Sequence, residues 1–382
     1  MIYLDYHATT PVDPRVAEVV LAFMTDQFGN ASSVDHGVGD RSRGAVEQAQ
    51  RSIAELIHCQ PQEIIFTSGA TESINLAIQG TVLHHEHQGK IPRFAITAVE
   101  HQAVLDTCQR LQQQGRIELF MLPVDRQGNL NLDLVEKLCC QGLDLLCTMA
   151  ANNEVGTIYP LEILGNIATR HNIPFFCDGS QAVGKIPINF HGWGITLLAM
   201  SGHKLYAPQG IGALICRRDY PLEPLLFGGG HQQGLRPGTL NLPGIVGLGE
   251  ACCLSQREMV VDHTAIAAKR DYLQCQLMGA IPELVVNGNQ GQRLAGNLHI
   301  AIPGIPHSAV IARIRHQLAI STGSACSSGT VTPSHVLRAM NLPDTLMDGA
   351  LRIGIGKFTT DQEIEAAAKI LIETIGVVRS LI

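Results

Sequence analysis

Lys204 ends a short polar stretch, Ser201-Gly202-His203-Lys204, and Asp178 lies one predicted strand earlier in the chain. A lysine in a loop of small polar residues, with an acid one strand upstream, is the arrangement that holds pyridoxal phosphate. The lysine forms the Schiff base, and the acid pairs with the pyridine nitrogen. Such a lysine taken alone is more often a solvated surface residue. The pair therefore predicts a pyridoxal site only if other residues converge on it.

The order of apolar and helical segments predicts a scaffold that brings strand ends together. The predicted strands cover residues 64–67, 93–96, 118–121, 145–148, 175–177, 196–199 and 211–216. Helices are expected between them and, before the first strand, from Pro14 to about Phe28 and over 40–57. Strands that alternate with helices of this length indicate an α/β fold with a mostly parallel sheet.

The remaining chain predicts a second, smaller α/β unit, since 382 residues exceed what one hydrophobic core usually serves. A long helix over 243–281 leads to strands near 285, 298 and 352–355 and to a last helix after Thr359. We expect a large cofactor-binding domain over 16–254. The small domain is expected to combine 1–15 with 255–382 and to carry a cysteine loop at about 321–332.

Candidate ligand groups follow the predicted strands, where parallel sheets bind ligands. Ala70 and Thr71 open a helix after Ser68-Gly69, and free N–H groups at such a start suit a phosphate, although an ordinary capped turn has the same residues. His101 follows the next strand, where an imidazole could stack on a cofactor ring or move protons, or serve only the structure. Asn152-Asn153-Glu154 offers amides to an anion, or is a polar turn.

Asp178 ends a strongly apolar strand, and a carboxylate there is costly unless something pairs with it. A protonated pyridinium would pair with it and would remain an effective electron sink. A helix N-cap is the alternative, because Gly179-Ser180-Gln181 follows. Ser201 and His203 can add phosphate contacts directly before Lys204.

Composition excludes several other classes of protein. The net charge of −7, without a basic run, argues against nucleic acid or an anionic membrane as partner. We expect a cytoplasmic protein, because the first residues resemble a strand rather than a signal sequence and no span is long enough for a bilayer. The eleven cysteines show no CxxC spacing and mostly lie in apolar runs, so neither a disulfide framework nor a metal site is expected.

Seven motifs together resemble one family over nearly the whole chain. They are Tyr3-Leu4-Asp5-Tyr6-His7-Ala8-Thr9-Thr10-Pro11, Thr67-Ser68-Gly69-Ala70-Thr71-Glu72-Ser73, Glu100-His101-Gln102-Ala103-Val104-Leu105, Asn152-Asn153-Glu154-Val155-Gly156, Ser201-Gly202-His203-Lys204, Gly228-Gly229-Gly230-His231 and Ser324-Ala325-Cys326-Ser327-Ser328. The combination is similar to the cysteine desulfurases of the IscS and NifS type. The resemblance implies a fold-type I pyridoxal-phosphate enzyme, normally a homodimer, with L-cysteine as substrate.

The resemblance also implies a role for each site residue. Lys204 would form the internal aldimine, Asp178 would pair with the pyridinium, Gln181 would donate to the ring hydroxyl and His101 would stack on the ring. The phosphate would be held by Ala70, Thr71, Ser201, His203 and, from the other subunit, Thr239. Asn153 and Arg352 would hold the substrate carboxylate, for which a guanidinium fork is well suited.

Cys326 decides the reaction, because it lies among small polar residues that cannot bury a thiol well. An exposed thiol can ionise and attack, whereas a buried one is inert. Its thiolate would take the substrate sulfur, alanine would leave, and the persulfide would pass to an acceptor such as an iron–sulfur scaffold protein. Glycines at 323 and 329 are plausible hinges for the loop.

Some residues depart from the resemblance, and other functions stay open. His7 stands where relatives usually carry a small residue, and Gln232 and Pro237 replace the usual glutamate and serine near Thr239. The chain ends at Ile382 without the extended tail that approaches the scaffold in IscS-type enzymes, which leaves the acceptor open. A cystine or cysteine C–S lyase would not need Cys326. A selenocysteine lyase and a catalytically silent sulfur-transfer scaffold are the remaining alternatives.

Overall fold

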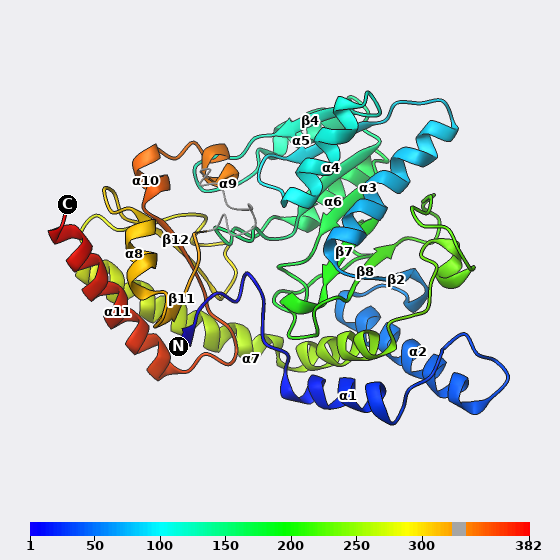
Figure 1. The fold of residues 1–382 in the computed structure, drawn as a ribbon. Helices are drawn as coiled ribbons and strands as arrows, with labels where there is room; N and C mark the ends of the chain where they lie inside the picture. The colour runs from blue at the N-terminus through cyan, green and yellow to red at the C-terminus, as the bar shows by residue number, and fades with distance from the viewer. Residues whose placement is uncertain (323–333) are drawn as a thin grey trace.

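The computed structural model describes residues 1–322 and 334–382 and has two units (Figure 1). The larger unit contains a seven-stranded sheet in the order β2-β8-β7-β6-β5-β3-β4. Its strands are β2 (Ile64–Thr67), β3 (Arg93–Thr97), β4 (Glu118–Leu122), β5 (Leu145–Met149), β6 (Phe175–Asp178), β7 (Leu197–Ser201) and β8 (Gly212–Cys216). Only β8 runs against its neighbours, so the other six strands point the same way and their carboxyl ends share one edge. The predicted α/β fold with a mostly parallel sheet is confirmed.

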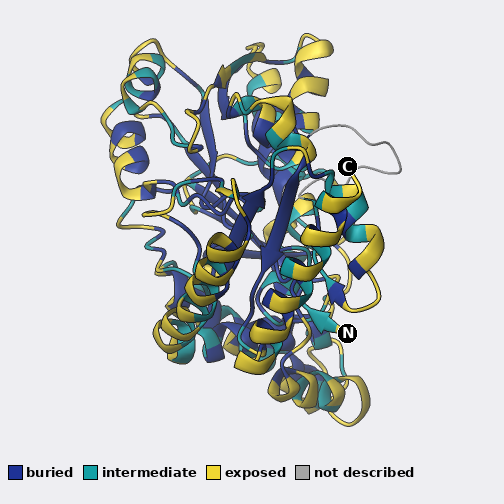
Figure 2. Cartoon of the chain, turned by 90° about the vertical axis from the view of Figure 1, so that its left-hand side faces the viewer, coloured by how far each residue is buried: buried dark blue, intermediate teal, exposed yellow. Residues whose placement is uncertain are grey.

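Helices cover both faces of this sheet, as an apolar parallel sheet requires. In β6, Phe175 and Cys177 belong to the core on one face and Phe176 to the core on the other, because side chains alternate along a strand. One face is covered by α3 (Ala70–His87) and α4 (Gln102–Gln113). The other face is covered by α2 (Gly37–Ile57), α5 (Leu132–Cys140) and α6 (Leu161–Arg170), with α1 (Pro14–Thr25) beside them. Figure 2 shows the buried strands between helices whose outer surfaces are exposed.

Local signals explain how these helices begin. The side chain of Asp13 accepts a hydrogen bond from the backbone N–H of Arg15, and Pro14 occupies the first helical position of α1. The helix ends at Thr25, three residues before the predicted end, because its last turn closes at Asp26. The predicted helix over 40–57 begins slightly earlier, at Gly37, where the side chain of His36 caps it.

The smaller unit contains both termini and a core of its own (Figure 1). Its central strand β10 (Asn297–Ala301) pairs in antiparallel fashion with β12 (Ala350–Gly354) and β9 (Val285–Val286). Beside them, β1 (Ile2–Tyr3) pairs in parallel with β11 (Leu318–Ala319). The helices of this unit are α8 (His307–Ile314), α9 (His335–Ala339), α10 (Asp344–Asp348) and α11 (Asp361–Ser380). Short 3₁₀ turns elsewhere are η1 (Pro61–Glu63), η2 (Gly202–Lys204) and η3 (His231–Gly234).

One 39-residue helix, α7 (Leu242–Ala280), runs beneath both units (Figure 1). Its first three turns are buried against α1 and α2, and Leu273 and Leu277 near its other end lie in the core of the smaller unit. The helix therefore crosses the predicted domain boundary at residues 254 and 255 without a break. The exact boundaries stay a prediction.

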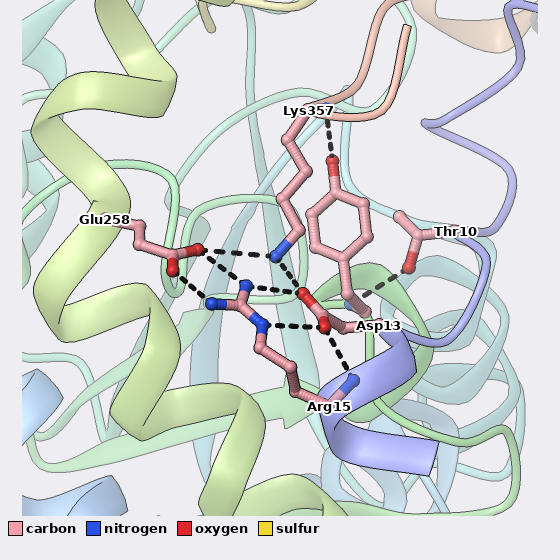
Figure 3. Close-up of polar contacts among 6 residues, drawn as sticks. Thr10, Asp13, Arg15, Glu258 and Lys357 are labelled. Carbon is pink, nitrogen blue, oxygen red and sulfur yellow. Dashed lines mark hydrogen bonds and ion pairs between the residues drawn. The ribbon is translucent and has the colours of Figure 1, made fainter. Parts of the chain in front are cut away.

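A cluster of charges, which we call the clasp, joins α1, α7 and the small unit (Figure 3). It consists of Asp13, Arg15, Glu258 and Lys357. Arg15 Nη2 lies 2.8 Å from Asp13 Oδ2 and 2.9 Å from Glu258 Oε2. Lys357 Nζ lies 2.5 Å from Asp13 Oδ2 and 3.7 Å from Glu258 Oε2. These contacts hold the segment before α1 against the segment that follows β12.

Two further expectations concern thiols and membranes. Of the ten cysteines in the described ranges, all are free thiols and six are buried, namely Cys108, Cys139, Cys147, Cys177, Cys216 and Cys252. The expectation of reduced, mostly buried thiols is confirmed for them. No helix within 1–322 or 334–382 has the length and apolar character needed to cross a bilayer.

Candidate active site

The loops at the common strand edge bring most of the predicted site residues together. Ala70 and Thr71 follow β2, His101 follows β3, Asn153 follows β5, Asp178 ends β6, and Ser201 ends β7. Because β2, β3, β5, β6 and β7 run in the same direction, these residues lie along one edge of the sheet. The prediction that the chemical groups collect at strand ends is confirmed.

Lys204 lies in η2 directly after β7, against the N-terminal segment of the chain. Its Nζ donates to the backbone carbonyls of His7 and Ala8, at 2.5 Å from each oxygen. His203 is held to the same segment through a hydrogen bond of 3.0 Å between Nδ1 and Thr9 Oγ1. Burial and the nearby Lys204 charge lower the pKa of His203 to about 4, so this imidazole is neutral at physiological pH.

Asp178 is buried at the end of β6, and Oδ1 accepts hydrogen bonds from the backbone N–H and the hydroxyl of Ser180, at 2.9 and 2.5 Å. The turn thus uses one carboxylate oxygen of Asp178, as expected if this residue also serves as a cap. Glu100 lies nearby, and burial together with the Asp178 charge raises the pKa of Glu100 to about 8. Glu100 is therefore protonated and uncharged at neutral pH.

Gln181 is fixed by a small network behind Lys204. Its Nε2 donates to the His7 carbonyl at 3.0 Å, and its Oε1 lies 3.2 Å from His7 Nδ1 and 3.2 Å from Lys185 Nζ. His7 is buried, and burial with the charges of Lys185 and Arg352 holds the pKa of His7 well below its usual range. The position that departs from the family resemblance is thus part of the site.

The start of α3 fits a phosphate group. Gly69 precedes it with φ of +153°, a conformation that favours glycine, and contributes no side chain to cap the first N–H groups of Ala70 and Thr71. A Cβ at Gly69 would lie 3.9 Å from Ser201 Oγ, so the serine hydroxyl borders the same space. A helix start with uncapped N–H groups, a nearby hydroxyl and an adjacent lysine is a suitable binding site for an anion.

Arg352 and Asn153 are brought together, as predicted, but with an additional partner. Arg352 is buried in β12; its Nη1 donates to the Asn153 carbonyl at 3.1 Å and its Nη2 to Asp5 Oδ1 at 3.0 Å. Its Nε has no hydrogen-bond partner among the described residues. The arginine therefore keeps N–H groups for a further acceptor, among them the buried Nε–H, and Asp5 competes with an incoming carboxylate.

Glu154, the residue after Asn153, is a second buried acid near Arg352. Glu154 Oε2 accepts a hydrogen bond of 2.8 Å from the hydroxyl of Ser334, which caps α9. Burial raises the pKa of Glu154 to about 7, and burial lowers that of the neighbouring His299 to about 3. Ser321, at the other end of the undescribed segment, exchanges two backbone hydrogen bonds with Arg352. Of the described residues on either side of that segment, Ser321 therefore bonds to Arg352 and Ser334 to Glu154.

Three predicted residues are placed less closely or not at all. His101 caps α4, and its Nδ1 accepts from the N–H of Ala103 at 3.1 Å, so its proton is on Nε2. Thr239 is exposed on the segment that follows η3. Within η3, the side-chain amide of Gln232 accepts from the backbone N–H of Phe66 and donates to its carbonyl, on the edge strand β2. Cys326 lies outside the described residues, so its role stays a prediction.

Several groups that the fold adds to the site were not predicted from the sequence. Lys185 lies four residues after Gln181, a spacing that places both on one side of a helical turn and could have been noticed. Glu100 was visible as a charge beside an apolar strand. Asp5 and His299 had no local signal, because each reaches Arg352 from a distant part of the chain.

Comparison with known proteins agrees with this geometry. The aminotransferase class-V family matches residues 2–367. The chain belongs to this family. A cysteine desulfurase IscS from Rickettsia bellii is 41% identical over 383 residues, which are 100% of this chain and 92% of that protein. A mitochondrial cysteine desulfurase from Arabidopsis thaliana is 38% identical over 382 residues, with 100% of this chain and 83% of that protein covered.

Solved structures of class-V aminotransferase relatives have the same fold. A NifS-like protein superposes with a TM-score of 0.91 at 32% identity and covers 98% of this chain and 99% of its own. A structure described as SspA in complex with cysteine has a TM-score of 0.83 at 32% identity, with 94% of this chain and all of that chain covered. This class-V aminotransferase is therefore a fold-type I pyridoxal-phosphate enzyme.

Proposed function

We propose that the protein is a cysteine desulfurase, which converts L-cysteine to L-alanine and leaves the sulfur as a persulfide on Cys326. The observation that carries the proposal is the meeting of Lys204, Asp178 and the Asn153–Arg352 pair at one strand edge, in a chain whose full-length relatives are named cysteine desulfurases.

The residues present fit pyridoxal phosphate. The start of α3, with Ala70, Thr71 and Ser201, would hold its phosphate with His203, and Asp178 would lie under the pyridine nitrogen. Gln181 and His101 would contact the ring, and Thr239 would complete the phosphate site from a second subunit. When bound, this cofactor supplies an electron sink for charge that develops at the substrate α-carbon.

The chain itself orients the substrate and moves its protons. Arg352 and Asn153 hold the carboxylate, and the buried Nε–H of Arg352 is a donor without a hydrogen-bond partner among the described residues. The amine of Lys204 takes the α-proton, because the carbonyls of His7 and Ala8 hold it at the site. The Cys326 thiolate forms the S–S bond as the substrate C–S bond breaks, and the carbon fragment gains a proton and leaves as alanine.

The partners follow from the same proposal. The persulfide passes to an acceptor protein, such as an iron–sulfur scaffold, in the cytoplasm. A homodimer would bring Thr239 of one subunit to the phosphate site of the other. The exposure of Thr239 and of nearby Phe227, which is 89% exposed, supports an interface in this part of the chain.

The experiment compares wild type with Cys326→Ala, and with Cys275→Ala as the matched control, since Cys275 is exposed on α7 away from the site. Each protein is given cysteine, and alanine and total sulfide are measured with a reductant present. Wild type and Cys275→Ala should form alanine and sulfide in equal amounts, and Cys326→Ala should lose alanine formation at least a hundredfold.

Two results would contradict the proposal. Undiminished sulfide release by Cys326→Ala, with pyruvate and ammonia formed in place of alanine, would indicate a C–S lyase. The absence of any absorbance band from lysine-bound cofactor would favour a silent scaffold.

A further inference from the structure

His7 is the point where three parts of the site meet. Its backbone carbonyl accepts from both Lys204 Nζ, at 2.5 Å, and Gln181 Nε2, at 3.0 Å. Its ring is buried, and a Cβ added at Gly354 would lie 3.0 Å from its Cδ2, so the ring packs against β12. The ring is therefore held between the lysine loop and the small unit.

The hydrogen bonds determine which way the Gln181 amide faces. The His7 carbonyl can only accept, so the group beside it must be the amide nitrogen, Nε2. The amide oxygen then faces Lys185 Nζ, which can only donate while it is charged, and His7 Nδ1 at 3.2 Å. Since this oxygen can only accept, His7 Nδ1 must carry the ring proton.

From this network we infer that His7 is a positioning residue. Its Nδ1–H and its carbonyl hold the Gln181 amide so that the second Nε2–H, rather than the oxygen, faces the ring hydroxyl of the cofactor. The inference rests on the proposed function for the contact between Gln181 and the cofactor. It goes beyond that function because it assigns a role to a residue that departs from the family resemblance.

The surroundings keep this arrangement over the working pH range. Burial and the charges of Lys185, Arg352 and Lys204 lower the pKa of His7 well below its usual range, so its imidazole is neutral. Burial and the Lys204 charge also lower the pKa of Lys185 to about 7, so Lys185 is only partly charged at pH 7. His7 Nε2 has no hydrogen-bond partner within the described ranges. Asp262 and His263 line a cavity with His7 and Lys185. A neutral imidazole with its proton on Nδ1 is the form that donates to Gln181.

A donor at the cofactor ring oxygen stabilises the ring phenolate, which makes the nearby protonated Schiff base easier to deprotonate. Loss of the donor should therefore raise the pKa of the lysine-bound cofactor. One neutral hydrogen bond corresponds to about half to one pKa unit. The absorbance of the lysine-bound cofactor reports this pKa directly, without turnover.

The first experiment is a pH titration of this absorbance in wild type, His7→Ala and His7→Asn. The alanine variant should raise the pKa by about half to one unit. Asparagine places an N–H near the position of Nδ1, so His7→Asn should stay close to wild type. An unchanged pKa in His7→Ala, or an equal rise in His7→Asn, would overturn the inference. Thermal unfolding shows whether each variant folds. A variant that does not fold is replaced by His7→Gln, whose side-chain N–H lies one bond further from the backbone than that of asparagine and is therefore misplaced for Gln181 Oε1.

The second experiment needs no cofactor. Histidine labelled with ¹⁵N in the cofactor-free protein should give a His7 signal, assigned by its loss in His7→Asn, that is neutral and protonated on Nδ1 from pH 6 to 8. A proton on Nε2, or ordinary titration near pH 6.5, would refute the inference. Failure of the desulfurase proposal is recognised separately, since alanine would then be missing while both His7 results could still hold.

Discussion

The clasp and the active site both collect charges from distant parts of the chain, but they treat those charges differently. In the clasp, every buried polar side-chain atom of Asp13, Arg15, Glu258 and Lys357 has a partner among the described residues. At the site, His7 Nε2, Glu100 Oε2, Glu154 Oε1 and Arg352 Nε have no hydrogen-bond partner within the same ranges. Each such atom costs about 1 to 3 kcal/mol of folding free energy.

Buried polar groups therefore serve two purposes in this protein, one in the clasp and another at the site. A fully paired cluster stabilises one arrangement of the two units, because breaking the contact between Asp13 and Lys357 leaves a buried charge without its partner. Unpaired donors and acceptors destabilise the folded protein but can bind a ligand that supplies the missing partner. We therefore expect substitutions in the clasp to change stability and substitutions at the site to change chemistry.

The largest contrast should come from the two lysines. Lys204→Ala should lower the rate of alanine formation at least about a thousandfold, since its amine is both the cofactor link and the base. Lys357→Met should keep the rate at a temperature where it is folded, because the described contacts of the Lys357 amine are with Asp13 and Glu258 of the clasp and with the rings of Tyr206 and Phe358. Equal losses of activity in the two variants would break the comparison.

Arg352→Lys should have the next largest effect. Lysine loses the fork that reaches Asn153 and Asp5 together, so kcat/KM for cysteine should fall about a hundredfold, mostly through KM. Steady-state kinetics over a range of cysteine concentrations measure the split between kcat and KM. A loss confined to kcat would argue against carboxylate binding by this arginine.

Asp13→Asn tests the clasp itself. Hydrogen bonds from Arg15 and Lys357 hold the pKa of Asp13 well below its usual range. A depressed pKa stabilises the folded state above the unfolded pKa, and this contribution is lost as the pH falls through the folded pKa. The variant should lose about 3 kcal/mol at pH 7, as for a broken buried pair, and the gap to wild type should narrow toward pH 3. Urea unfolding at several pH values gives the result; a constant gap would mean that the charge of Asp13 is irrelevant.

Glu100→Gln should have the smallest effect on activity, and its effect on stability should depend on pH in the opposite sense to that of Asp13→Asn. The pKa of Glu100 is raised to about 8, so the wild type is penalised as the pH rises from about 4 toward 8. Glutamine keeps the acceptor for Thr97 and for the N–H of Met149 and never ionises. At pH 8.5 the variant should be more stable than wild type by about 4 to 5 kcal/mol, and at pH 5 by about 1 kcal/mol. Thermal melts at the two pH values test this, and an unchanged difference would place Glu100 in a more polar site than its burial indicates.

Most of the scaffold could be predicted, because its signals are local. Apolar runs placed all seven strands of the main sheet within a few residues, and Asp13-Pro14 marked the start of α1. The site was predictable as a set of strand-end residues, since parallel strands carry their carboxyl ends to one edge. Arg352 was harder to interpret, because no neighbouring residue indicates that it is buried in β12 and pairs with Asp5.

The sequence alone determined the residue types, their order along the chain and the strand ends that they follow, because these depend on near neighbours. The tertiary structure decided which of those residues meet. Asp5 reaches Arg352 across 347 positions, and His7 reaches Gln181 across 174. Such contacts form only when the small unit packs on the sheet, and the resulting burial shifts the pKa values of His7, Glu100 and Glu154. The charge states at the site are therefore properties of the fold, since they depend on how much water it excludes.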